Sequence, residues 1–241
     1  MRKTYTILGC LAVLVLVVYS LIPESSFVEN IFPLEEGVAV IHYDDRNDGG
    51  SSTATLMKSD SSMKFECVLG TDTTAYAWCG MLWNFDPDTL EAFRNWTFVD
   101  SLVLDIETSG TKEILVKLWA FDPDVTDLKK PRSFRLLMKE VTVSGGRERI
   151  AIPMDQFYTP DFWYEGEHVD RELKSRHQES MARVEVAPGW DQPRGVHFSI
   201  VFHGVCAKGL SNFWFGIVLF AFLGLTIVAV GFRHHKKNED N

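Results

Sequence analysis

The sequence predicts a mainly β protein, a jelly-roll β-sandwich of two sheets, flanked by two transmembrane α-helices. Many short runs of alternating polar and apolar residues, separated by Gly, Asp, Asn and Pro turns, fill the middle of the chain. An uncharged apolar stretch lies near each end, at residues 7–22 and 213–232. The part between these two stretches has the length of one ordinary domain.

The C-terminal stretch Phe213–Phe232 carries no charge, and Thr226 is its only hydroxyl. A helix rises about 1.5 Å per residue, so the stretch extends over roughly 30 Å, the thickness of the hydrocarbon core of a bilayer. A buried core helix is the alternative, but a core helix of this length usually keeps a polar stripe. The sequence therefore predicts a transmembrane helix over residues 211–232.

The N-terminal stretch Ile7–Ile22 follows Arg2 and Lys3, an arrangement also found in signal peptides. No small-x-small cleavage site follows it, and with residues 4–6 it is long enough to span a membrane. We therefore expect residues 1–22 to form an uncleaved transmembrane helix with its tip in the cytoplasm.

Basic residues flank both predicted helices on the side of the chain terminus. They are Arg2 and Lys3 before the first helix and Arg233, Lys236 and Lys237 after the second. Positive flanks stay in the cytoplasm, so the sequence predicts a two-pass protein with both termini inside. Beyond the membrane we expect a linker at 23–36 and a β-sandwich domain at 37–207, and in the cytoplasm a tail at 233–241.

Short β-like runs follow one another through the central domain. The predicted strands are 37–43, 53–58, 62–69, 75–85, 99–108, 112–121, 132–143, 147–152, 182–187 and 194–203. Alternation is clearest at 101–107, where Leu102, Leu104 and Ile106 share one face. A further stretch, Glu167–Gln178, reads equally well as a helix or as a loop.

The charge balance and the missing motifs exclude several functions. The chain has 24 basic and 33 acidic residues, a net charge of −9, and shows no basic stripe, which excludes nucleic-acid binding. It lacks a phosphate-binding glycine loop, a Gly-x-Ser-x-Gly elbow and paired Cys-x-x-Cys motifs. The sequence accordingly predicts a protein that is not an enzyme.

Three carboxylates, those of Asp44, Asp45 and Asp48, lie beside a Gly-Gly turn in the segment Tyr43–Thr53. Hard oxygen ligands on a bent loop suit a structural calcium ion, although the spacing is not that of an EF-hand. The alternative is a turn whose Asp and Asn side chains cap their own backbone. Both interpretations are open, and calcium is the only cofactor that the sequence suggests.

Cys67 and Cys79 lie on two successive predicted strands around a turn at 70–74. If these strands pair as a hairpin in register, the two thiols meet and can form a disulfide. Two buried free thiols are the alternative. Both cysteines lie in the part predicted beyond the membrane, where disulfides form.

Polar side chains fall opposite the apolar positions of several predicted strands. If those strands are neighbours, an outer face carries an aromatic platform among charged groups, a surface that suits sugars. The candidate ligand-binding residues are Trp119, Lys117, Arg135, Glu107, Asp105, Trp163 and His197. A plain solvated face is the alternative. A glycosidase pair of Asp105 and Glu107 is a further one, disfavoured because nothing in the sequence marks a raised pKa.

The stretch Ile152–Gly166 is rich in aromatic residues and contains two prolines, a composition too irregular for a helix. One interpretation is a segment that covers the sandwich and buries Phe157 and Trp163. The other is the aromatic edge of a ligand site.

Five features together resemble galactose-binding-like jelly rolls: YDDRNDGGSST, KFECVLG…WCGMLWNF, FVDSLVLDIET, IPMDQFYTPDFW and GVHFSIVFHG. That group includes some carbohydrate-binding modules and the complex I intermediate-associated protein family. The resemblance covers about residues 37–205 and is strongest to the extracytoplasmic domains of bacterial membrane sensors. It implies a periplasmic jelly roll at the bacterial inner membrane that binds a carbohydrate or another small ligand.

Such sensors continue into a kinase or a cyclase, whereas nine residues follow the second predicted helix here. We therefore expect a binding or sensing module that is an accessory subunit beside a membrane protein partner carrying the output. The alternative is a structural or assembly protein whose sandwich binds another protein. Fold alone does not decide between them.

Overall fold

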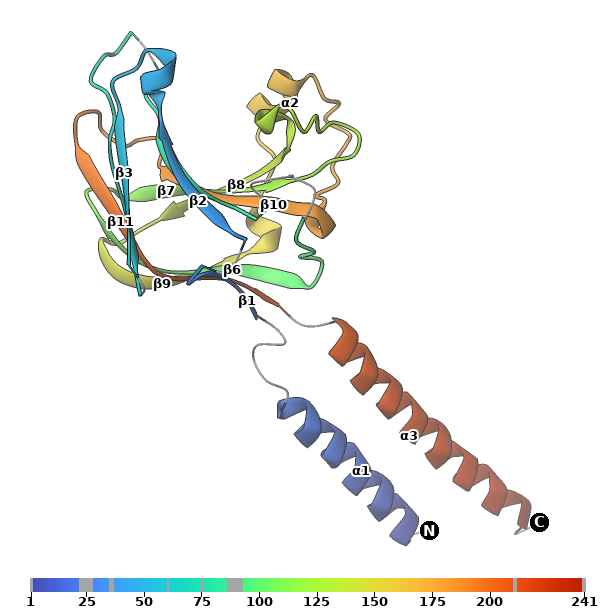
Figure 1. Ribbon diagram of the computed structural model, residues 1–241. Helices are drawn as coiled ribbons and strands as arrows, with labels where there is room; N and C mark the ends of the chain where they lie inside the picture. The colour runs from blue at the N-terminus through green and yellow to red at the C-terminus, as the bar shows by residue number, and fades with distance from the viewer. Residues whose placement is uncertain are drawn as a thin grey trace. The chain divides into compact units, whose positions relative to one another are not determined.

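The computed structural model of the chain, shown in Figure 1, consists of two compact units. One unit combines Met1–Val28 with Gly209–Asn241, and the other is Glu29–Lys208. The structure describes residues 2–21, 28–34, 37–59, 61–74, 76–85, 93–209 and 212–239.

The first unit consists of two α-helices in contact, α1 (Arg2–Ser20) and α3 (Asn212–Glu239). Large apolar side chains are exposed on both, for example those of Ile7 and Phe220. Helices are thus confirmed near both ends of the chain. Among the residues described, however, no helix reaches the combined length and apolarity that a membrane crossing demands. The two predicted crossings stay predictions.

The second unit is built from strands with a few short helices. Its strands are β1 (Val28–Phe32), β2 (Ala39–Asp44), β3 (Thr53–Lys58), β4 (Met63–Val68), β5 (Cys79–Asn84), β6 (Val99–Ser109), β7 (Glu113–Ala120), β8 (Arg135–Thr142), β9 (Gly146–Pro153), β10 (Met181–Pro188) and β11 (His197–Gly209). Sheet A has the order β3-β4-β11-β6-β9, with β1 also paired to β11. Sheet B has the order β2-β5-β10-β7-β8.

The strand order is that of a jelly roll. From β4 to β11, sheet A contains β4-β11-β6-β9 and sheet B contains β5-β10-β7-β8. The chain therefore crosses repeatedly between two antiparallel sheets, which is how two Greek keys build this fold. The topology confirms the predicted mainly β jelly roll.

The core lies between the two sheets and is filled from alternate positions along the strands. In β4, Met63, Phe65 and Cys67 are buried while the residues between them are partly exposed. Trp83 of β5 meets Phe202 of β11 edge to face, with ring centroids 5.1 Å apart. Because β5 belongs to sheet B and β11 to sheet A, this contact crosses the core.

The predicted disulfide between Cys67 and Cys79 is confirmed, with Cα atoms 6.6 Å apart. The predicted hairpin between their strands is wrong, because β4 pairs with β3 and β11 while β5 pairs with β2 and β10. Both cysteines point into the core, so the bond joins the two sheets. Residue parity indicates which face a thiol occupies but not which sheet its strand enters.

The predicted linker at 23–36 contains strand β1, which pairs with β11. Ile31 and Phe32 account for this strand, because they bury their side chains in the core. The stretch predicted to be too irregular for a helix contains helix α2 (Asp161–Glu167), which ends where His168 adopts the left-handed conformation.

Candidate functional site

The segment after β9 covers the outer side of sheet B near β7 and β8. It runs through a 3-10 turn, η4 (Met154–Gln156), and α2 to a second turn, η5 (Gln178–Ser180). It packs on the sheet through a second apolar cluster, whose buried members are Leu115, Leu136, Met138, Trp163 and Ala187. Tyr158 also exchanges two backbone hydrogen bonds with Met138 of the edge strand β8, at 2.7 and 3.0 Å. The segment therefore protects that edge of the sheet.

A buried ion pair fixes the loop that follows α2. Arg135, 1% exposed, donates from Nε to Asp122 Oδ2 at 2.9 Å and from Nη1 to the Leu173 carbonyl at 2.9 Å. Its guanidinium lies 4.5 Å from the centroid of the Trp163 ring, and Trp163 Nε1 donates to the Phe134 carbonyl at 2.8 Å. A buried charge is tolerated only with its partners in place, so these contacts define the position of the loop.

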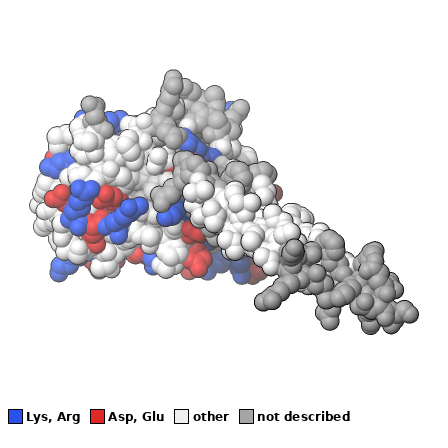
Figure 2. Space-filling view, turned by 90° about the horizontal axis from the view of Figure 1, so that it is seen from below, with Lys and Arg blue, Asp and Glu red and all other residues white. Residues whose placement is uncertain are grey.

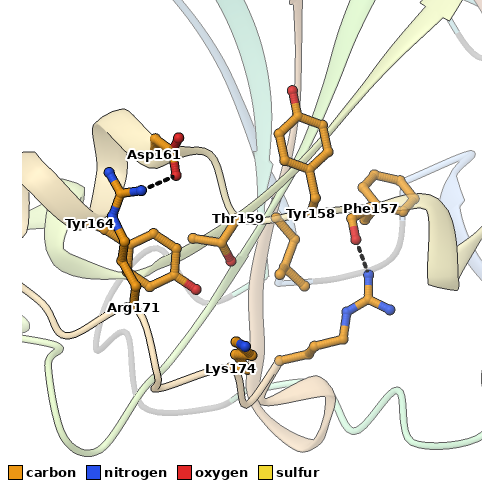
Figure 3. Close-up of a pocket in the computed structure, with 9 residues that line it drawn as sticks. Phe157, Tyr158, Thr159, Asp161, Tyr164, Arg171 and Lys174 are labelled. Carbon is orange, nitrogen blue, oxygen red and sulfur yellow. Dashed lines mark hydrogen bonds and ion pairs between the residues drawn. The ribbon is translucent and has the colours of Figure 1, made fainter.

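Between β8, α2 and this loop lies a pocket of about 440 Å³, within the range of small-molecule sites. Leu137 and Phe157 form its buried apolar part. Figure 3 shows Tyr164, Thr159 and Lys174 converging on the same space. The pocket thus combines apolar and aromatic walls with hydrogen-bonding groups.

The charged lining of the pocket is mostly basic. Arg171 forms ion pairs with Asp161 at 3.0 Å, drawn as a dashed line in Figure 3, and with Glu165 at 2.8 Å. Lys174 and Arg176 complete the lining.

Three exposed aromatic side chains adjoin the pocket, and we call Tyr158, Phe162 and Trp190 the aromatic patch. Their side chains are 44%, 51% and 60% exposed. Phe162 and Trp190 meet edge to face at 6.2 Å. Glu140 accepts hydrogen bonds from the Tyr158 hydroxyl at 2.5 Å and from Trp190 Nε1 at 3.3 Å. Tyr158 also lines the pocket, so the patch and the pocket share this residue.

The pKa values of Tyr158 and Glu140 in this patch are shifted in opposite directions. Partial burial, followed by the hydrogen bond to Glu140 and its charge, raises the pKa of Tyr158 to about 12. Partial burial acts against it, but hydrogen bonds from Tyr158 and Trp190 lower the pKa of Glu140. At neutral pH Tyr158 is therefore a donor and Glu140 an acceptor.

The predicted residues Lys117 and Trp119 come together around a carboxylate that the sequence did not single out. Glu185 of β10, 5% exposed, accepts from Lys117 Nζ and from Trp119 Nε1, each at 2.7 Å, and from the Tyr43 hydroxyl. Burial, and then the charge of Glu185, raise the pKa of Tyr43 well above its ordinary value. Each of these four polar side chains therefore has a hydrogen-bond partner within the protein.

Arg135 and Trp163, also predicted to contact a ligand, lie behind the pocket as buried supports, 1% and 4% exposed. They position the loop and α2. Both residues therefore support the pocket from behind and are not among the residues that line it.

The remaining predicted ligand residues lie on the opposite side of the molecule, on the outer face of sheet A. Each faces an ionisable neighbour: the pairs are Asp105–Arg147 at 2.9 Å, Glu107–His203 at 3.7 Å and His197–Glu66 at 3.4 Å. Figure 2, seen from the side on which β6 and β9 lie in Figure 1, shows acidic and basic side chains gathered in one area. The predicted platform required the strands of these residues to be neighbours. They are not, because β6 belongs to sheet A while β7 and β8 belong to sheet B.

Asp105 has the wrong electrostatics for a general acid. The hydrogen bonds from Arg147 lower the pKa of Asp105, with burial acting in the other direction. A glycosidase acid needs a raised pKa, so this carboxylate is poorly suited to that role.

The carboxylates near the Gly-Gly turn act as the capping interpretation predicts. Asp44 accepts from the Arg46 backbone N–H at 3.2 Å and pairs with the Arg46 guanidinium at 2.7 Å. Asp45, 1% exposed, accepts from the Ser52 backbone N–H at 2.8 Å, whereas Asp48 is exposed. In the described ranges, no group of three or more His, Cys, Asp or Glu side chains is arranged to hold a metal ion. The calcium interpretation gains no support.

Sequence reasoning missed Arg171, Lys174, Arg176 and Trp190. The three cations lie in a charged stretch that was open to interpretation as a helix or a loop, and charge alone does not reveal a pocket. Trp190 carried a usable signal, because a large aromatic residue directly after Pro188-Gly189 sits on a turn and not in a strand.

No protein family matches the sequence of the chain, and neither does any curated protein. Solved structures resemble its fold. The family 11 carbohydrate-binding module of a cellulosomal cellulase from Clostridium thermocellum is 12% identical, covers 76% of this chain and 95% of its own, and has a TM-score of 0.49. The family 30 module of another cellulase from that organism is 10% identical, with 66% and 84% covered and a TM-score of 0.42. At these values the likeness concerns the fold, and the function proposed below does not rest on it.

Proposed function

We propose that the sandwich binds carbohydrate across the pocket and the aromatic patch. The observation that carries this proposal is the exposed Trp190–Phe162 pair beside a pocket with tyrosine walls and hydrogen-bonding groups. A sugar ring has CH groups on its faces and hydroxyls around its rim. Aromatic rings pack against the faces, while carboxylates, cations and hydroxyls bind the rim, which is the mixture that this surface offers.

The proposed role is binding without catalysis. Glu140, the carboxylate within the patch, has a lowered pKa and is already bonded to Tyr158 and Trp190. Such a group accepts hydrogen bonds from sugar hydroxyls but is a poor proton donor.

The proposal includes membrane anchoring through both terminal helices. It is supported by the uncharged sequence Phe213–Phe232 and by exposed apolar side chains such as Val13 and Ile227, which are 60% and 64% exposed. The Cys67–Cys79 disulfide supports export of the sandwich, because disulfides persist in oxidising compartments. We propose a periplasmic sandwich at a bacterial inner membrane, with both termini in the cytoplasm.

We further propose that the protein is an accessory subunit that reports ligand binding to a membrane partner. The connection between sandwich and helix is short, since β11 ends at Gly209 and α3 begins at Asn212. Coupling requires the sugar to have different affinities for two states of the assembly. Activity of the partner is therefore expected to change with sugar concentration.

The test of sugar binding is calorimetric titration of the full chain, purified in a detergent without a sugar headgroup, against oligosaccharides selected on a glycan array. We expect at least one glycan to bind and Trp190→Ala to weaken binding about tenfold or more, as for an aromatic anchor. Tyr76→Ala is the control, because it removes a side chain that is 93% exposed and lies outside the patch.

Two outcomes would overturn the proposal: no glycan binds, or the Trp190 and Tyr76 variants bind equally well. In the first case the aromatic patch is better explained as a contact surface for another protein, since aromatic residues are also enriched at protein interfaces. The protein would then be a structural or assembly factor.

A further inference from the structure

The pocket is locally basic in a protein whose overall charge is negative. Three basic side chains line it, those of Arg171, Lys174 and Arg176, against one acidic side chain, that of Asp161. With Glu165, which pairs with Arg171, three basic and two acidic described side chains leave one positive charge, in a chain with a net charge of −9. A concave surface lined by one sign of charge concentrates ligands of the opposite sign.

The three cations are not equivalent. Arg171 is paired with both Asp161 and Glu165, so two carboxylates already neutralise it. Within the part of the chain that the structure describes, neither Lys174 nor Arg176 forms an ion pair. The charge that a ligand meets is therefore that of Lys174 and Arg176.

Arg176 is held by backbone groups instead of by an acid. Its Nη2 donates to the Met154 carbonyl and, at 2.5 Å, to the Phe157 carbonyl. Partial burial lowers the pKa of Arg176, and the charge of Asp155 acts in the opposite direction. A guanidinium stays protonated at neutral pH, so a fixed positive charge remains at this side of the pocket.

Lys174 lies below Thr159 in Figure 3, across the pocket from α2. An ammonium is a compact point charge that attracts an anionic group without demanding one geometry. The hydroxyls of Tyr164 and Thr159 supply neutral hydrogen-bonding partners next to it. The pocket thus offers a sugar ring its polar contacts and offers an acidic substituent two cations.

We propose that this pocket selects an acidic sugar residue, one that carries a carboxylate or a sulfate group. The inference rests on the proposed carbohydrate binding and names the class of sugar. Lys174 and Arg176 contact the anionic group, Tyr164 and Thr159 contact the ring, and the aromatic patch takes the neighbouring residue of the chain.

The experiment measures the affinity of the full chain for three oligosaccharides of equal length: a neutral one, one containing uronic acids and one bearing sulfates. Sodium acetate and sodium sulfate are titrated separately as the bare ions. The variants are Lys174→Gln, the conservative Lys174→Arg, and Lys112→Gln as a control for an exposed lysine outside the pocket.

We expect at least one acidic oligosaccharide to bind about tenfold tighter than the neutral one, an advantage that falls as salt is added. Lys174→Gln is expected to remove most of this advantage and to leave neutral binding within about twofold, because it removes a charge and no packing. Lys174→Arg keeps the advantage, and Lys112→Gln changes nothing. Binding of only one acidic class supports the inference and identifies the anionic group.

Other outcomes overturn it. Equal binding of neutral and acidic oligosaccharides, unchanged in Lys174→Gln, rejects acidic selectivity while carbohydrate binding stands. Acetate or sulfate binding as tightly as the acidic oligosaccharide shows a site for small ions and rejects sugar selectivity. Failure of every oligosaccharide to bind removes the proposed function itself.

Discussion

The outer sides of the two sheets carry the same kinds of charged residue but place them in different surroundings. On sheet A, Asp105 and Arg147 pair at the surface, with side chains 32% and 59% exposed. Over sheet B, Asp122 and Arg135 pair beneath the segment that contains α2, each with a side chain that is 1% exposed. Water screens the first pair, whereas the second pair lies where an unpaired charge is strongly unfavourable.

The difference comes from the cover segment and not from the sheets. Trp163 of the cover segment packs with Leu115 of β7 and Met138 of β8, and the ion pair beneath the segment fixes the loop of the pocket. Sheet A has no comparable cluster on the outer face of its described strands, and its charges pair with their neighbours in solvent. The pocket therefore lies on the side where the sheet is covered.

The largest expected effect separates the two ion pairs directly. Arg135→Met removes the guanidinium partner of the buried Asp122, which keeps, among the described residues, only His177 Nε2 at 3.5 Å and the Asp124 backbone N–H at 3.0 Å. We expect a loss of about 3–5 kcal/mol in the free energy of unfolding. Arg147→Met, the matched change on sheet A, is expected to cost about 0–1 kcal/mol. Urea denaturation measures both, and equal losses would contradict the contrast between the two faces.

The next effect is the stability that the disulfide between the two sheets contributes. Cys67→Ala combined with Cys79→Ala removes the bond between them, and we expect a loss of about 3 kcal/mol because the unfolded chain gains freedom. Thermal unfolding under reducing and non-reducing conditions checks this. The reduced wild-type protein is expected to match the double variant, and an unchanged melting temperature would refute the role of the bond.

A third prediction compares two carboxylates. Glu185→Gln disturbs a nearly buried acceptor of three hydrogen bonds on sheet B, and we expect a cost of about 1–3 kcal/mol. Glu66→Gln on sheet A, which pairs with Lys64 at 2.6 Å and with His197, is expected to cost about 0–1 kcal/mol. Chemical denaturation decides, and a larger cost at Glu66 would reverse our ranking.

The smallest effect concerns Tyr158 at alkaline pH. Its pKa is raised above the ordinary tyrosine value to about 12, so its stabilising contribution is complete below pH 10 and is lost as the pH rises through 12. Partial exposure keeps this contribution below about 1 kcal/mol. In an absorbance titration of tyrosine, Tyr158→Phe should remove one step near pH 12, and Glu140→Gln should move that step to lower pH.

The sequence predicted the strands and their buried faces well, because alternation follows from the pleat of a strand and is local. Parity placed Leu102, Leu104 and Ile106 on one face, and all three are buried in the core. It did not predict that β6 and β7, adjacent in the chain, enter different sheets, because strand pairing depends on contacts between distant residues. The predicted platform was therefore divided between two faces.

The site was only partly accessible from sequence for the same reason. In Ile152–Gly166 the cover interpretation is confirmed, since Phe157 and Trp163 are buried. Tyr158 and Phe162 are exposed, and an aromatic edge of a ligand site stays a prediction. Nothing local indicates which aromatic side chain faces solvent in an irregular segment. The hydrogen bond from Arg135 to the Leu173 carbonyl, 38 residues away, holds the loop of the pocket. No spacing of residue types in the sequence indicates this contact.

The bond between Cys67 and Cys79 also determines how the protein responds to proteolysis. The intervening segment includes Tyr76, whose side chain is 93% exposed and which is an accessible cleavage point. A single cut there yields two fragments that sulfur still links across the sandwich. On a denaturing gel without reductant the two fragments migrate together, and a reductant separates them. Cleavage in this loop therefore does not release either fragment under oxidising conditions.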